Sequence, residues 1–303
     1  ALEGRIEAGD WERRFYELAL KISGAVQARR WTRTVDGGGF IHSFNGPHSL
    51  FVDTVRSLRS LALAHRFGHL LLEENDARVS LLGRLVEHAR ATARYCVYYG
   101  TGRASWDVRG RVVHESIFNV VDGRYRCPSS QQGYSPFSTW TRGLAWALTG
   151  FAEELEFLDT VADAELAAHG GRADIEGFML EAARATADFW IDNTALDGIP
   201  YWDTGAPGLE RLGDWRAKPA DPFNPHEPVD SSAAAIACQG LMRLGRRLAA
   251  RGDAPAGGRY RSAGLTVLAA LLAEPYLSVV AVSLKQLLHS VYHRPNGWAA
   301  VPP

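Results

Sequence analysis

The sequence predicts an all-α protein, built as an α/α toroid or an irregular helical array. Apolar residues recur at spacings of three and four through several long segments, which is the helical period. Loops rich in Gly, Pro and aromatic residues separate these segments, and no pattern typical of parallel strands is present. Because no low-complexity linker divides the chain, we expect residues 1–303 to form a single domain.

Composition is that of an ordinary globular protein, with 303 residues, 46% hydrophobic residues and a formal net charge of −1. No basic block indicates a nucleic-acid partner, and no apolar run of about 18 residues predicts a membrane span. The widely separated Cys96, Cys127 and Cys238 predict neither a disulfide framework nor a zinc site. No secretory signal is visible, which favours the cytoplasm; an apolar leader upstream of Ala1 would instead indicate the periplasm or secretion.

The helical period predicts the approximate limits of the helices. They cover residues 11–30, 54–68, 76–98, 136–157, 172–192, 231–250, 259–272 and 279–292. The loops at 36–49 and 198–208 are rich in aromatic and polar residues, which is typical of functional loops. The stretch 207–230 contains Trp215 and Phe223, which predicts a packed surface loop.

Asp53, just before the helix at 54–68, is the candidate for proton chemistry. Val55, Leu58 and Ala62 fall on one face of that helix, which we expect to be buried. An Asp before a helix is commonly an N-cap. A carboxylate in a cleft lined by aromatic residues would also be desolvated, which raises its pKa and helps it to deliver a proton. Both roles are compatible.

His114 has two interpretations as well. It could hydrogen-bond a sugar hydroxyl or orient Asp53, although a lone His is more often structural. The pair His114 and Glu115 lacks a second His four residues after the first, so the zinc-protease helix is absent. No nucleotide-binding loop, serine-hydrolase elbow or metal cluster appears in the sequence, and these chemistries are disfavoured.

The stretch 131–146 indicates a site for an anionic sugar. Ser135 followed by Pro136 predicts a helix start, which puts Trp140 and Arg142 in the first two turns. There the backbone amides and the helix dipole favour a carboxylate, which Arg142 could bind in bidentate fashion while Trp140 stacks on a sugar ring. A capped helix with a buried Trp and a surface Arg would explain the same residues without a ligand.

The helix at 231–250 follows Asp230. We interpret Asp230 as its cap in preference to a catalytic group. The small residues Ala233, Ala234 and Ala237 predict close approach of another helix.

An ordered set of motifs resembles the unsaturated glucuronyl hydrolases, glycoside hydrolase family 88. The motifs are GGFIHSF at 38–44, FVDT at 51–54, QQGYSPFSTWTRGLAW at 131–146, GIPYWD at 198–203, DSSAAAIA at 230–237 and HSVYHRP at 289–295. The resemblance covers most of the chain and implies an (α/α)6 barrel. It also implies an acidic oligosaccharide substrate with a 4,5-unsaturated uronic acid at its non-reducing end. Neither a metal nor an organic cofactor is implied.

By this resemblance, Asp53 matches the family's catalytic acid/base. It would protonate C4 of the vinyl ether, and water would add at C5 to give a hemiketal that releases the rest of the sugar. Phe44 falls near a family aromatic that is usually Trp. The remaining matches are substrate-contacting positions, namely His114, Gln132, Trp140 and Arg142.

Departures from the family pattern predict differences in subsite preference and in the completeness of the barrel. Gln131 stands where the family commonly has His, and Pro136 and Phe137 stand where it has Asp, which indicates a different subsite preference. A second active-site Asp and a C-terminal Trp-Gly-Asp-Tyr segment have no match, so we expect a barrel incomplete at both ends. Besides the glucuronyl hydrolase, a rhamnogalacturonyl hydrolase and a non-catalytic sugar-binding or helical interaction domain stay open.

Overall fold

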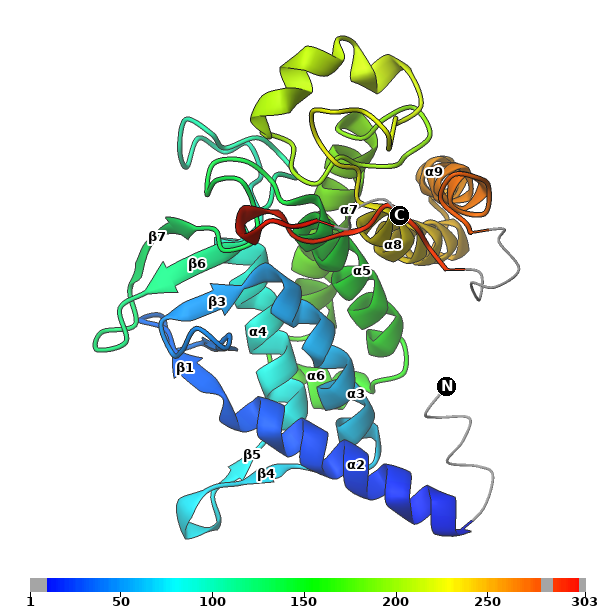
Figure 1. Ribbon diagram of the computed structural model, residues 1–303. Coiled ribbons are helices and arrows are strands. Elements are labelled where there is room, and N and C mark those ends of the chain that lie inside the picture. Colours follow the sequence, from blue (N-terminus) through cyan, green and yellow to red (C-terminus); the bar gives the residue numbers. More distant parts are fainter. Residues whose placement is uncertain (1–9, 279–285, 300–303) are drawn as a thin grey trace.

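The computed structural model describes residues 10–278 and 286–299 and is mostly helical. The helices form an array in which α5 packs between α7 and α8, while α9 lies on α8 and α2 lies on α3 (Figure 1). Within the described ranges, no helix is long and apolar enough to cross a membrane. The helix bounds are α2 (Asp10–Arg29), α3 (Leu58–Arg66), α4 (Leu81–Tyr95), α5 (Thr141–Leu158), α6 (Asp163–Ala167), α7 (Arg172–Asp192), α8 (Ser231–Ala250) and α9 (Ala254–Leu271).

The prediction of an all-α fold is wrong in one respect, because short antiparallel strands lie between the helices. Strands β3, β6 and β7 form one sheet, and the others pair as β1–β2, β4–β5 and β8–β9. These strands are too short for an alternating pattern to distinguish them from loops. Their bounds are β1 (Trp31–Arg33), β2 (Gly39–Ile41), β3 (Ser49–Phe51), β4 (Leu71–Leu72), β5 (Arg78–Val79), β6 (Glu115–Phe118), β7 (Tyr125–Ser129), β8 (Val291–His293) and β9 (Trp298–Ala299).

Side-chain caps explain where two helices begin. α4 begins at Leu81 and not at residue 76, because residues 78–79 pair in β5 and Ser80 Oγ accepts a hydrogen bond from Gly83 N at 3.0 Å. α9 begins at Ala254, earlier than predicted, because Asp253 caps it. Both caps satisfy backbone amides of a first helical turn.

The helix predicted at 279–292 is wrong over residues 286–292, while residues 279–285 lie outside the described residues. Leu287 forms an antiparallel bridge with Leu277, and Val291–His293 forms β8. This chain segment crosses above the start of α5 (Figure 1). It thereby adds Tyr292 and His293 to the cavity described below.

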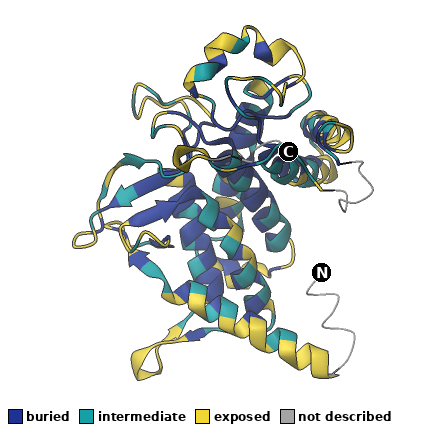
Figure 2. Cartoon of the chain, viewed as in Figure 1, coloured by how far each residue is buried: buried dark blue, intermediate teal, exposed yellow. Residues whose placement is uncertain are grey.

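The core lies along α5, which packs closely on η1 (Val52–Ser57) and on α8 (Figure 2). Two glycines permit this approach. A Cβ at Gly150 would lie 2.6 Å from Val55, and one at Gly240 would lie 2.7 Å from Thr149. As predicted, the small residues at the start of α8 and the Val55 face of the η1–α3 segment are buried.

The stretch 207–230 forms the packed loop that we predicted, with η3 (Pro207–Leu212) and η4 (Trp215–Ala217) inside it. Trp215 is buried and meets Tyr201 edge to face, with ring centroids 5.4 Å apart. Phe223, in contrast, is exposed. The loop is therefore anchored by Trp215.

Candidate functional site

The starts of η1, α5 and α8 meet at one cavity of about 530 Å³, a size typical of ligand sites. Its lining combines a carboxyl group, two guanidiniums, amides and aromatic rings. The lining residues are Phe44, Asp53, Arg56, Gln131, Gln132, Trp140, Arg142, Trp146, Ser232, Ile236, Tyr292, His293 and Asn296. The structure therefore brings together all the sequence-predicted site residues except His114, which lies directly behind Trp140.

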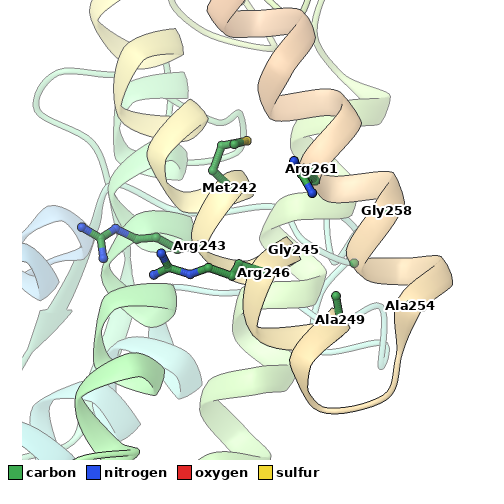
Figure 3. A pocket seen from close by; sticks show the side chains of 9 residues that line it. Met242, Arg243, Gly245, Arg246, Ala249, Ala254, Gly258 and Arg261 are labelled. Carbon is green, nitrogen blue, oxygen red and sulfur yellow. The ribbon is translucent and has the colours of Figure 1, made fainter.

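A second cavity, of about 710 Å³, lies between α8 and α9 (Figure 3). Its floor consists of glycines and alanines, and Arg243, Arg246 and Arg261 are its polar lining residues. Arg243 and Arg246 both pair with Glu156. The lining contains no carboxyl or imidazole group that could transfer a proton, so we place the candidate chemistry in the first cavity.

Asp53 is the second residue of η1 and lines the cavity without capping the helix. Phe51 is the N-cap position, and no side chain caps η1. Oδ1 of Asp53 is buried and has no hydrogen-bond partner among the described residues. Burial raises the pKa of Asp53, while the charges of Arg56 and Arg142 oppose the rise. The N-cap interpretation is wrong, and the expected desolvation of Asp53 is confirmed.

His114 is buried and organises the loop before α5. Its Nδ1 accepts hydrogen bonds from the backbone amides of Gln131, at 3.0 Å, and Gln132, at 3.1 Å. Because Nδ1 accepts hydrogen bonds, the neutral His114 ring carries its hydrogen on Nε2. Burial, together with the charges of His293 and Arg142, lowers the pKa of His114 to about 3, so the ring is neutral. Nε2 is buried without a partner among the described residues and is the one donor that His114 can offer.

α5 begins at Thr141 and not at Pro136, because the preceding residues are held in another conformation. Ser135 Oγ accepts from the amides of Phe137 and Ser138, which closes a turn. Arg111 donates to the carbonyls of Pro136, Phe137 and Ser138, and these hydrogen bonds stabilise the non-helical conformation of the segment. Trp140 is the N-cap position of α5, so Arg142 lies in its first turn, closer to the helix end than predicted.

Arg142 is held on three sides. Its guanidinium donates to the carbonyl of Tyr292 and stacks over Trp140, with Cζ 5.0 Å from the ring centroid. Its Nε lies 4.0 Å from Asp230 Oδ2. Arg142 is the second residue of α5, and the helix dipole favours an anion at that end of the helix.

Aromatic side chains contribute unequally to the cavity. Trp140 is only 4% exposed and contacts both Arg142 and His114, which leaves little of its ring for a sugar. Phe44 is 73% exposed and packs edge to face on Phe51. Phe44 therefore offers more open apolar surface than Trp140 does.

Asp230 caps α8, as predicted. Oδ1 accepts from the amides of Ser232, at 3.1 Å, and Ala233, at 3.2 Å. Burial raises the pKa of Asp230, and the charge of Arg142 is the largest influence that opposes the rise.

Sequence reasoning missed Arg56, Trp146, Tyr292 and Asn296. Two signals were available. Trp146 lies four residues after Arg142, which puts both on one face of α5, and Tyr292 lies inside the HSVYHRP motif.

The scaffold is mostly helical, and one cavity joins a desolvated carboxyl group, aromatic rings and a guanidinium, a combination typical of a small-molecule site. No protein-family model matches the chain. Two curated proteins named unsaturated glucuronyl hydrolase are similar. The protein from Formosa agariphila is 27% identical over 135 residues, which is 44% of this chain and 26% of the relative. The protein from Bacillus sp. strain GL1 is 30% identical over 135 residues, which is 45% of this chain and 28% of the relative.

Solved structures extend the likeness along the chain. The unsaturated glucuronyl hydrolase of Bacillus sp. GL1 matches with a TM-score of 0.71 at 22% identity. The match covers 98% of this chain and 65% of the Bacillus chain. The unsaturated glucuronyl hydrolase from Streptococcus agalactiae matches with a TM-score of 0.69 at 21% identity. This match covers 97% of this chain and 61% of the Streptococcus chain. These likenesses show a shared fold. The chain is similar to proteins named unsaturated glucuronyl hydrolase, and it spans less than two thirds of the length of the relatives that it matches.

Proposed function

We propose that the chain hydrolyses unsaturated glucuronyl oligosaccharides, as a single domain built on the (α/α)6-barrel plan. The observation that carries the proposal is Asp53, a carboxyl group with a raised pKa and an unpartnered buried oxygen in a cavity shared with Arg142. The likeness to proteins of that name supports it.

Asp53 suits the protonation of a vinyl ether. Desolvation favours its neutral form, which holds the proton that C4 needs. Proton transfer to C4 leaves positive charge at C5, shared with the ring oxygen, and the carboxylate formed on Asp53 stabilises that charge. Water then adds at C5 and returns a proton to Asp53. The hemiketal collapses and releases the rest of the sugar.

Arg142 suits recognition of the uronate carboxylate. Its guanidinium is fixed by Trp140, Tyr292 and Asp230 at the start of α5, so little side-chain entropy is lost when an anion binds. A mutant of the Streptococcus agalactiae enzyme was solved in complex with dGlcA-GalNAc6S. That complex supports an acidic oligosaccharide as the substrate class here.

The proposal is tested by incubating the full chain with disaccharides made by a polysaccharide lyase. We expect the absorbance of the conjugated C4=C5 bond to disappear and the second sugar to be released in equal amount. A disaccharide with a saturated uronate should be left intact. Binding of the unsaturated disaccharide without loss of absorbance would support a non-catalytic sugar-binding domain and contradict the proposal.

A further inference from the structure

Arg56 is a second guanidinium in the cavity of Asp53 and Arg142. It belongs to the 3-10 helix η1, in which residues three apart lie above one another. Arg56 is therefore on the same side of η1 as Asp53. Its charge is the largest of the influences that oppose the effect of burial on the pKa of Asp53. A ligand that reaches Asp53 is consequently within the field of Arg56.

Trp146 orients Arg56. The Arg56 Cζ atom lies 5.2 Å from the centroid of the Trp146 ring. Trp146 follows Arg142 by four residues, so both side chains are on the same face of α5. Arg56, which lies over Trp146, is therefore on the same face of α5 as the Arg142 guanidinium. Stacking covers a face of the Arg56 guanidinium but leaves the N–H groups at its edge to bind an oxyanion.

Arg56 has no carboxylate partner in an ion pair within the part of the chain that the structure describes. Its neighbours differ in this respect. Arg59, one turn further along, pairs with Glu153 at 3.0 Å, and Arg142 faces Asp230. The charge of Arg56 is therefore available to an anion that enters the cavity.

We propose that Arg56 binds a second oxyanion of the substrate, so that the site selects oligosaccharides with a sulfate ester on the sugar next to the unsaturated uronate. This inference rests on the proposed function, because it assigns the uronate carboxylate to Arg142. One carboxylate occupies one planar guanidinium fork. A second fork in the same cavity, held by its own tryptophan, matches a second anionic group.

The test compares the wild-type full chain with Arg56→Gln on pairs of unsaturated disaccharides that differ by one sulfate ester on the second sugar. We expect the wild type to have a higher kcat/KM for at least one sulfated form, and Arg56→Gln to reduce that preference about tenfold. The readout is the ratio of the kcat/KM values for the sulfated and the unsulfated disaccharide, because a changed pKa of Asp53 affects both values equally. Arg59→Gln is the matched control, since Arg59 pairs outside this cavity, and it should keep the wild-type ratio.

Two results would overturn the inference: a wild type without preference for any sulfated form, or an Arg56→Gln variant with the wild-type ratio. If the wild type turns over none of the disaccharides, the proposed function fails separately. Equilibrium binding of the same pairs then decides the role of Arg56. Loss of the sulfate preference in Arg56→Gln supports the anion site, and an unchanged preference contradicts it.

Discussion

Asp230 caps α8 with one carboxylate oxygen and faces Arg142 with the other. Oδ1 accepts hydrogen bonds from the first-turn amides of α8, while the buried Oδ2 lies 4.0 Å from Arg142 Nε. Because Asp230 is fully buried, its charge depends on these neighbours for stabilisation. The pair therefore joins the start of α8 to the start of α5, the two helices that frame the cavity.

This relationship predicts energetic coupling between Arg142 and Asp230. Arg142→Gln should lower the free energy of unfolding, because it leaves a buried carboxylate without its cation. The loss should be smaller in Asp230→Asn, in which Asn still caps α8 without a charge. Urea unfolding of both single variants and the double variant should give a coupling of about 1–2 kcal/mol. Additive effects would show that the two residues act independently.

Arg142→Lys should weaken binding of the unsaturated substrate by roughly 1–3 kcal/mol, the range of a charge-assisted hydrogen bond. Lys keeps the charge but lacks the planar fork that bridges the Tyr292 carbonyl and an anion. Calorimetric titration with the substrate and with its carboxyl-reduced analogue measures the effect. If Arg142→Lys keeps the wild-type ratio of the two affinities, the uronate carboxylate binds elsewhere.

The raised pKa of Asp53 predicts the pH dependence of activity. The acid must be protonated to act, so kcat/KM should fall as the pH rises through that pKa, above the ordinary value of 3.8. Arg56→Gln removes the largest charge that holds the pKa down and should move this fall to higher pH. A pH profile of kcat/KM for both proteins checks the direction. A shift to lower pH would mean that another group controls the reaction.

Glu154 in α5 predicts a pH dependence of stability that is independent of activity. It is buried, its Oε2 has no partner among the described residues, and burial raises its pKa from 4.5 to about 8. Between these values the folded chain holds a proton that the unfolded chain has released. The free energy of unfolding should therefore fall by about 2–4 kcal/mol as the pH rises through this window.

Glu154→Gln isolates that contribution, because Gln resembles the protonated side chain and cannot ionise. Its unfolding free energy should be less dependent on pH between about 5 and 8 than that of the wild type. Denaturant titrations at several pH values give the comparison. Parallel pH profiles would show that Glu154 does not hold a proton in the folded chain.

The residues that local patterns encode were predicted well. Asp230 is an Asp-Ser-Ser cap, so its position follows from helix chemistry, whereas Asp53 and Arg142 line the cavity from helix positions that differ from the predicted ones. The exact start of α5 was not predictable in this way. Arg111 donates to the carbonyls of Phe137 and Pro136 in the segment before Thr141, and these contacts join residues 26 and 25 positions apart in sequence.

Arg56 and Tyr292 could not be assigned to the site from local pattern. The helical period puts Arg56 on the side of Asp53, but it does not show that the cavity lies on that side or that Trp146 lies over the guanidinium. Tyr292 reaches Arg142 across 150 positions of sequence, from a segment that helical spacing predicted wrongly. Such long-range contacts are set by tertiary packing, which local propensity does not contain.

The most direct test of the central claim is Asp53→Asn, assayed by loss of vinyl-ether absorbance from a lyase-made disaccharide. Asn keeps the size of the side chain but has no proton to transfer. We expect turnover to fall at least about 10²–10⁴-fold, the usual contribution of a positioned acid, with an unchanged melting temperature and retained substrate binding. Wild-type turnover by a correctly folded Asp53→Asn variant would contradict the account.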